Sequence, residues 1–192
     1  EFEAFFRSHV TEYEAVTFSG SLPPGVPLTF YRDMIAIAHE AKVPVLLDSS
    51  GEALRQGVTA RPLLVKPNET ELADLAGKAP QDRSGVAQAA SELSVRYETL
   101  VVISIGPDGA IAAKRDQVWH IRPPQVTIKS AVGSGDSTLA GITFGLTHGF
   151  AFEDAVKYGV AAGTANALTV GAGHFTVENF ERVLAQVTVD RL

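Results

Sequence analysis

The feature that most constrains this chain is the alternation of short, nearly continuous apolar runs with amphipathic helical segments. Residues 43–51 (VPVLLDSSG) and 99–106 (TLVVISIG) are apolar and rich in β-branched side chains, as expected of strands that are buried on both faces. A helical pattern precedes each run, at 28–42 and 85–97. Such units predict an α/β fold with a mostly parallel, twisted sheet that is flanked by helices.

The rest of the chain divides into a first part of mixed strands and helices and a second part of helices alone. Further strands are predicted at 15–21 and 63–66, and shorter pieces that suit antiparallel pairing at 109–114, 117–122 and 125–129. After residue 134 no strand is expected. The remaining predicted helices are 1–14, 52–57, 67–77, 136–149, 151–168 and 176–187.

Composition limits the partners and the setting of this chain. The 192 residues are enough for one sizeable domain and carry a net charge of −6, which argues against a nucleic-acid or anionic-membrane partner. The absence of cysteine excludes disulfides and thiolate metal sites. No apolar run reaches the roughly 18 residues of a membrane span, so a cytoplasmic protein is expected.

The segment SAVGSGDSTLAG (130–141) places two glycines around a serine at the start of a predicted helix. A dinucleotide-binding fingerprint would need a following strand that ends in an acidic residue, and two helices follow instead, so that interpretation fails. Two interpretations remain. The segment is either a plain loop whose Asp136 interacts favourably with the helix dipole, or a site for phosphoryl transfer to an alcohol.

Phosphoryl transfer accounts for the glycines as well as for the carboxylate. Backbone N–H groups at a helix N-terminus can hold the moving phosphoryl group, and Gly133, Ser134 and Gly135 would supply them without a bulky side chain in the way. The reaction also needs a base for the proton of the attacking hydroxyl. Asp136 follows directly and can be that base.

Two other loops follow predicted strands, where ligands bind in parallel sheets. In KPNETE (66–71), Asn68 and Glu71 lie one helical turn apart and can organise Mg²⁺ with its water, while Lys66 can neutralise a phosphate of ATP. The alternative is that Asn68 caps its helix and Glu71 completes a capping box. In SIGPDGA (104–110), two glycines three residues apart suit contact with a nucleotide, although a hairpin turn explains them equally well.

These motifs, in this order, resemble the ribokinase-like (PfkB) family of sugar kinases. VGSGDSTLAG is similar to the family's C-terminal signature, VKPNETEL to its N-x-x-E magnesium motif, and VISIGPDGA to its nucleotide-binding strand and loop. FSGSLPPGV, LDSSGEAL and RPPQV look most like the phosphosugar branch, particularly the minor-type 6-phosphofructokinases. The resemblance covers essentially the whole chain.

The resemblance implies ATP-dependent phosphorylation of a phosphorylated ketohexose, with fructose 6-phosphate as the leading candidate. It leaves 1-phosphofructokinase and tagatose-6-phosphate kinase as alternatives within the same class. A nucleotide-binding fragment without catalysis is an alternative of another class.

The resemblance also implies roles for residues at matching positions. Asp136 would be the catalytic base and contact the substrate, beside an anion hole of Gly133, Ser134 and Gly135. Ser21 would touch the sugar phosphate, unless it only caps its turn, and Glu71 with Asn68 would hold Mg²⁺. The ATP site would be lined by Lys66, Asn68, Ser104, Gly106, Gly109, Val160, Gly163 and Thr164. A K⁺ ion would lie among Ser130, Val132, Asn166, Gly171 and Gly173, although Gly173 replaces a larger side chain of similar kinases.

Members of this family carry additional N-terminal strands and a β-sheet lid ahead of the region matched here. Residues 1–192 are therefore expected to be the C-terminal, nucleotide-binding part of a kinase, without those strands and without the lid. In the phosphofructokinase-like members the lid makes the dimer contact, so the parent protein is expected to be a homodimer. These 192 residues alone are expected to bind ATP weakly and to leave sugar unphosphorylated.

Overall fold

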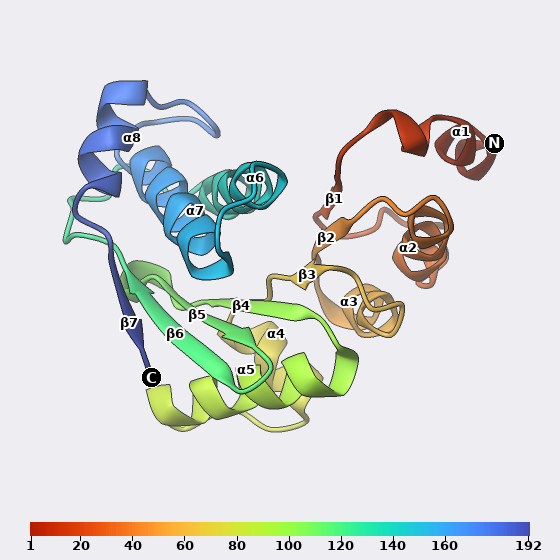
Figure 1. Ribbon diagram of the computed structural model, residues 1–192, viewed down its shortest axis with the longest axis horizontal. Coiled ribbons are helices and arrows are strands. Elements are labelled where there is room, and N and C mark those ends of the chain that lie inside the picture. Colours follow the sequence, from red (N-terminus) through yellow and green to blue (C-terminus); the bar gives the residue numbers. More distant parts are fainter.

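The structure, a computed structural model that describes residues 1–192, has three layers, with one sheet between two groups of helices (Figure 1). The seven strands lie in the sheet in their sequence order. Strands β1 to β4 pair in parallel, and the pairs from β4 to β7 are antiparallel. The strands are β1 (Val16–Ser19), β2 (Val45–Asp48), β3 (Leu64–Val65), β4 (Leu100–Ser104), β5 (Ala110–Lys114), β6 (Gln117–Arg122) and β7 (Thr188–Arg191).

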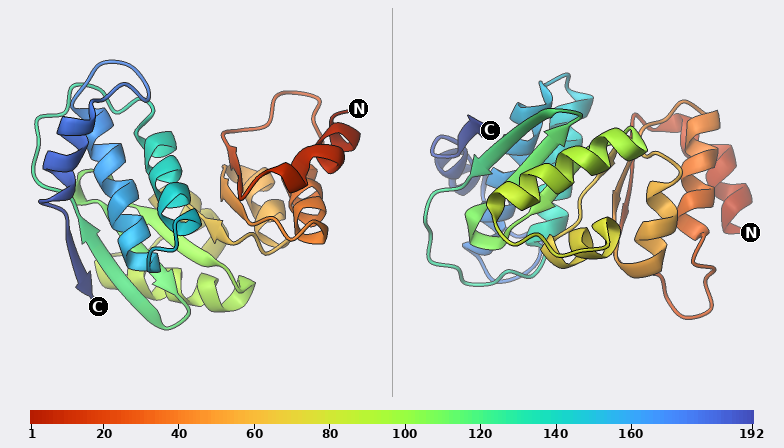
Figure 2. Two further views of the ribbon diagram at one scale, coloured as in Figure 1. Left: turned by 45° about the horizontal axis from the view of Figure 1, so that its top comes forward. Right: turned by 90° about the horizontal axis from the view of Figure 1, so that it is seen from below.

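Helices cover both faces of this sheet, and the two termini lie at opposite ends of the molecule (Figure 2). One face is covered by α2 (Phe30–Glu40), α3 (Gly51–Val58), α4 (Glu69–Ala76) and α5 (Arg83–Tyr97), and α1 (Phe2–His9) packs beside α2. The other face is covered by α6 (Ser134–Thr147), α7 (Phe152–Ala167) and α8 (Val177–Leu184). Two short 3₁₀ turns are η1 (Val10–Glu12) and η2 (Gly106–Asp108). None of the helices combines the length and the apolar character that crossing a membrane would need.

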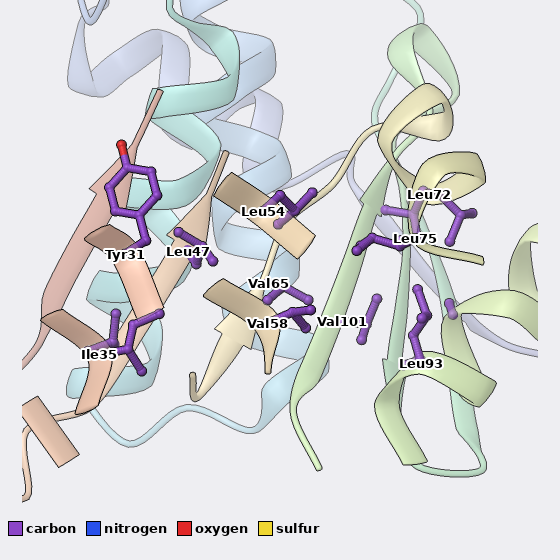
Figure 3. Packing of buried hydrophobic residues seen from close by; sticks show 14 of the residues in the cluster. Tyr31, Ile35, Leu47, Leu54, Val58, Val65, Leu72, Leu75, Leu93 and Val101 are labelled. Atoms are coloured by element: carbon purple, nitrogen blue, oxygen red, sulfur yellow. The ribbon is translucent and has the colours of Figure 1, made fainter. Parts of the chain in front are cut away.

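The alternation of side chains along each strand produces two hydrophobic cores, one on each face. Leu47 and Val65 point toward α2–α5, where they pack with residues such as Leu54 (Figure 3). Their neighbours Leu46 and Leu64 point the other way and pack against α6–α8. All of these side chains are buried, which explains why the strands are apolar along their whole length.

The α/β fold with helices on both faces is confirmed, and the predicted strands and helices are mostly shortened at their ends. One predicted strand is wrong: residues 125–129 pair with no strand. The prediction that no strand follows residue 134 is also wrong, because β7 pairs with β6. These two errors have one cause. Since β7 occupies the free edge of β6, residues 125–129 have no edge to pair with and instead pass over a cleft beside α6.

Candidate nucleotide-binding site

Polar side chains gather where the parallel strands end. Because β1 to β4 run in the same direction, Ser19, Asp48 and Ser104 close their strands at one edge of the sheet, and Lys66 follows β3 there. The Nζ atom of Lys66 lies 2.8 Å from Oδ2 of Asp48. Lys66 is only 5% exposed, so its charge needs this partner. A fixed ammonium group thus lies at the edge where ligands of parallel sheets bind.

The N-terminus of α6 points unpaired amides at the same edge. Gly133 is the N-cap residue with a φ of +79°, and a Cβ atom there would lie 2.5 Å from that of Ala172, so only glycine fits. The amides of Gly133, Gly135 and Asp136 donate no hydrogen bond within the chain. The N–H of Ser134, which was also predicted to contribute to the anion hole, closes a turn onto the carbonyl of Ala131 at 3.1 Å. Free amides at a helix N-terminus are groups that can bind an anion.

The amides and the cation converge on one place. A Cβ atom built on Gly135 would lie 3.7 Å from Nζ of Lys66 and 3.8 Å from Oδ2 of Asp48. The first turn of α6 therefore lies directly over the ion pair at the end of β2 and β3. An anion held by the amides would also meet the ammonium group, which strengthens the site electrostatically.

Asp136 lies on the other side of this helix end. The helix begins two residues earlier than predicted, at Ser134, which places Asp136 in its first turn. Its carboxylate is exposed and accepts a hydrogen bond from Oγ of Ser19 at 2.6 Å. Ser21, which the sequence singled out, is exposed in the loop after β1 and does not make this contact. The strand ends at Ser19 and the chain turns at Gly20, so the earlier serine of the pair reaches the carboxylate.

A cleft of ≈ 470 Å³ lies between the ends of β4–β6 and the helices α6 and α7. All eight residues that were predicted to bind ATP line it: Lys66, Asn68, Ser104, Gly106, Gly109, Val160, Gly163 and Thr164. Ser134 and Gly135 line it as well, so the first turn of α6, with the free amide of Gly135, borders it. Residues distant in sequence therefore enclose one space of a size suited to a small ligand.

Several lining residues were not found by sequence reasoning. Val126 and Ile128 come from the segment that was predicted to be a strand, and Thr138 comes from the second turn of α6. Val126 and Ile128, with Val102 and Ala110 from the sheet, add apolar surface to the cleft. The sequence carried no signal for this set, because the segment 125–129 has the alternation of an ordinary strand.

The capping alternative for Asn68 and Glu71 is present in the structure. The N–H of Glu71 donates to Oδ1 of Asn68 at 3.0 Å, and the N–H of Asn68 donates to Oε2 of Glu71 at 2.8 Å. Burial raises the pKa of the Glu71 carboxyl, and the neighbouring Asp48 carboxylate raises it further. The two acidic groups thus create a local excess of negative charge that a cation would relieve.

The donor set fits Mg²⁺ that is bound mainly by water and phosphate. Glu71 keeps one oxygen outside the capping box, and Asp48 lies close enough to raise its pKa. No group of three or more His, Cys, Asp or Glu side chains forms a metal cage. Mg²⁺ retains most of its hydration and needs only one or two protein carboxylates when phosphates complete its shell.

The residues predicted for K⁺ meet around one buried amide. Asn166 is fully buried, and its Nδ2 donates to the carbonyl of Val132 at 2.8 Å and to Oγ of Ser134 at 3.1 Å. Its Oδ1 accepts from the N–H of Gly173 at 2.7 Å, and Oγ of Ser130 accepts from the N–H of Val132 at 3.3 Å. The loop 169–173, which also carries Gly171, is thereby fixed to the turn that precedes α6. Backbone oxygens there are suitable ligands for a hard cation.

The pfkB family carbohydrate kinase model matches residues 1–179. This chain belongs to the PfkB family. The motifs that carried the resemblance all lie within the matched residues, and so do the residues that line the cleft beside α6.

Three comparisons locate this PfkB chain more closely. It is 32% identical over 191 residues to tagatose-6-phosphate kinase of Staphylococcus epidermidis, an alignment that covers 96% of this chain and 62% of that kinase. Phosphofructokinase-2 from Escherichia coli, solved in complex with substrates and products, is 34% identical and superposes with a TM-score of 0.87 over 96% of this chain and 61% of that one. The same enzyme in complex with potassium is 33% identical over 95% and 61% of the two chains, also with a TM-score of 0.87. The PfkB chain therefore spans about three fifths of the length of these relatives.

Proposed function

We propose that this chain is the nucleotide-binding part of a sugar phosphate kinase, which transfers the γ-phosphoryl group of ATP to a hydroxyl of a phosphorylated ketohexose. The observation that carries the proposal is the α6 N-terminus. Three of its amides are free, and Gly135 lines the cleft beside Lys66. The Asp136 carboxylate lies outside the cleft lining, where it accepts a hydrogen bond from Ser19. Phosphoryl transfer needs one group of donors that binds the phosphoryl oxygens and, next to it, a base that contacts the attacking hydroxyl.

Each group has a defined part in the transfer. The amides of Gly133, Gly135 and Asp136, together with Lys66, bind the phosphate oxygens and stabilise the charge that develops on them. The Asp136 carboxylate takes the proton of the acceptor hydroxyl as its oxygen attacks the γ-phosphorus. The bond from that phosphorus to the bridging oxygen breaks, and ADP leaves with the electron pair. Ser19, which donates to Asp136, orients the carboxylate.

Cations complete the proposed site. Glu71 and Asp48 would hold Mg²⁺ through water, and Mg²⁺ supplies neutralisation of phosphate charge when it is bound. The loops joined by Asn166 would hold K⁺, in keeping with the potassium complex of the Escherichia coli relative. A K⁺ ion there would stabilise the turn that carries Gly133 and so the orientation of its free amide.

Fructose 6-phosphate is the first proposed acceptor. The support is the likeness to phosphofructokinase-2, and the likeness to a tagatose-6-phosphate kinase makes tagatose 6-phosphate the second candidate. Fructose 1-phosphate is the third. The contact of Ser19 with Asp136 does not discriminate among these sugars.

A coupled assay of ADP release by the intact protein, with each of the three sugar phosphates and with no acceptor, tests this proposal. Turnover that depends on one of these sugars and gives a bisphosphate product is the expected result. ATP binding without turnover on any sugar phosphate would instead favour a nucleotide-binding module without catalysis. Absence of ATP binding would contradict both functions.

A further inference from the structure

His120 is a buried imidazole on β6 that no step of the proposed reaction uses. It is 2% exposed, and its Nε2 lies 2.9 Å from the backbone carbonyl oxygen of Asp108. Because a carbonyl only accepts, Nε2 carries the proton and donates. Burial lowers the pKa of His120, and the positive charges of Arg83 and Arg122 lower it further, against the opposing effect of the Asp108 contacts. The neutral ring that donates from Nε2 is therefore the form the site favours.

The carbonyl that accepts this hydrogen bond belongs to η2, the turn that borders the nucleotide cleft. Gly106 and Pro107 precede Asp108 in that turn and Gly109 follows it, and these three line the cleft while Asp108 does not. His120 thus holds the turn at its one residue that faces away from the cleft. His120 pairs across the sheet with Ile111 of β5, so the two side chains lie on the same face. Because Ile111 belongs to the core on the α2–α5 side, the imidazole ring also approaches the turn from that side.

Backbone hydrogen bonds also fix this turn. The N–H of Ile105 donates to the carbonyl of Gly109 at 2.9 Å and closes its base, whereas the bonds within the turn, from Asp108 to Ile105 at 3.3 Å and from Gly109 to Gly106 at 3.1 Å, are longer. The Asp108 carboxylate bonds to Nη2 of Arg83 at 2.9 Å, but both side chains are about half exposed, so this pair contributes little. The hydrogen bond from His120 is part-buried and comes from a side chain that is itself buried, so the ring holds the Asp108 carbonyl from inside the protein.

We propose that His120 is a positioning residue for nucleotide binding, which holds η2 in the conformation that presents Gly106, Pro107 and Gly109 to the ligand. This inference rests on the proposed function, because it assumes that the cleft binds ATP. The ring itself touches no ligand. It acts through the Asp108 carbonyl, from the opposite face of the loop.

The test is calorimetric titration of the folded chain with ATP and Mg²⁺, alongside thermal melts. His120→Leu removes the donor at similar volume, and we expect it to weaken ATP binding about tenfold, the value of one hydrogen bond. His120→Gln places an amide N–H near the position of Nε2, and it should restore most of the affinity. His120→Asn is too short to reach Asp108 and should behave like His120→Leu. His148→Leu, at an exposed histidine beyond the end of α6, is the control and should bind as the wild type does.

Each result has a distinct meaning. Wild-type affinity in a folded His120→Leu chain would overturn the inference and leave the proposed function intact. Equal loss of affinity in the Leu, Asn and Gln variants would also overturn it, because the imidazole would then matter only for packing. If His120→Leu does not fold, the ATP affinities of His120→Gln and His120→Asn are compared instead. Tighter binding by His120→Gln supports the inference, and equal binding overturns it. Absence of ATP binding by the wild-type chain would overturn the proposed function, and this inference with it.

Discussion

The two sides of the α6 N-terminus differ in how completely this chain builds them. On the cleft side, residues from β4, β5, α4, α6, α7 and the segment 123–128 enclose one space, which the buried Lys66 also lines. On the other side, Asp136 and the end of the edge strand β1 are exposed, and Ser19 is the one side chain that bonds to the carboxylate. Under the proposed function, this difference predicts that these residues bind the nucleotide by themselves, whereas binding of the acceptor requires further groups.

The largest expected effect is on kcat, from a substitution of Asp136 that leaves the cleft side unchanged. Asp136→Asn keeps the shape of the side chain and the amide of residue 136, but it removes the base. In the intact protein, kcat for sugar phosphorylation should fall by about 10²–10⁴-fold, as is typical when a general base is lost. The dissociation constant for ATP should stay within about twofold, because the groups of the cleft are unchanged.

Asp154→Asn is the matched control for that substitution. Asp154 is the third residue of α7, as Asp136 is of α6, so both variants remove a carboxylate from the same position of a helix. The control should lose only the favourable interaction with the helix dipole, worth about 0.3–1 kcal/mol. An Asp136→Asn enzyme that keeps more than about a third of the wild-type kcat would show that Asp136 is only a helix-capping acid.

A second prediction tests whether the cleft side depends on its close packing. Gly109 has a φ of +92°, and a Cβ atom there would lie 2.1 Å from the carbonyl oxygen of Ile121. Gly109→Ala should lower the free energy of unfolding by about 2–5 kcal/mol through backbone strain and overpacking, and should weaken ATP binding.

Gly106→Ala is the comparison within the same loop. Gly106 also has a positive φ, of +59°, but a Cβ atom there meets open space. Its substitution should cost only the left-handed strain, about 1–2 kcal/mol. Melting curves and ATP titrations of the two variants measure the difference, and equal losses would show that contact with Ile121 is unimportant.

A third prediction concerns the charge of Glu71. Its pKa is raised by burial and by Asp48, so the folded state holds this proton more tightly than the unfolded state does. The resulting stability is present below the unfolded pKa and is lost as pH rises through the folded pKa. At neutral pH the ionised Glu71 therefore opposes folding, and a bound cation offsets that effect.

Glu71→Gln removes the charge and keeps a residue that suits the capping box. Without metal at neutral pH, this variant should melt no lower than the wild type, and its relative advantage should disappear in acid. Addition of Mg²⁺ and ATP should raise the melting temperature of the wild type more than that of the variant. The control is Glu178→Gln, at an exposed acid in the first turn of α8. If Mg²⁺ and ATP raise the melting temperature of the wild type and of Glu71→Gln equally, Glu71 caps its helix and does not bind Mg²⁺.

Local sequence signals predicted much of this fold and the residues that line the cleft. Short apolar runs identified the buried strands, and Gly133 and Gly135 marked the start of α6, where the structure has free amides. What the sequence could not supply are pairings between distant segments. The strand β7 is short and polar, and only its partner β6 makes it a strand. The ion pair of Asp48 with Lys66 joins the ends of β2 and β3, and the contact of Ser19 with Asp136 depends on where β1 ends.

The central claim is that this chain alone contains a complete nucleotide site and an incomplete acceptor site. Calorimetric titration of the 192-residue chain with ATP and Mg²⁺, and separately with fructose 6-phosphate and tagatose 6-phosphate, tests it most directly. The account predicts saturable binding of one ATP per chain and no measurable heat with either sugar phosphate. Absence of ATP binding by the folded chain, or saturable binding of either sugar phosphate, would contradict it.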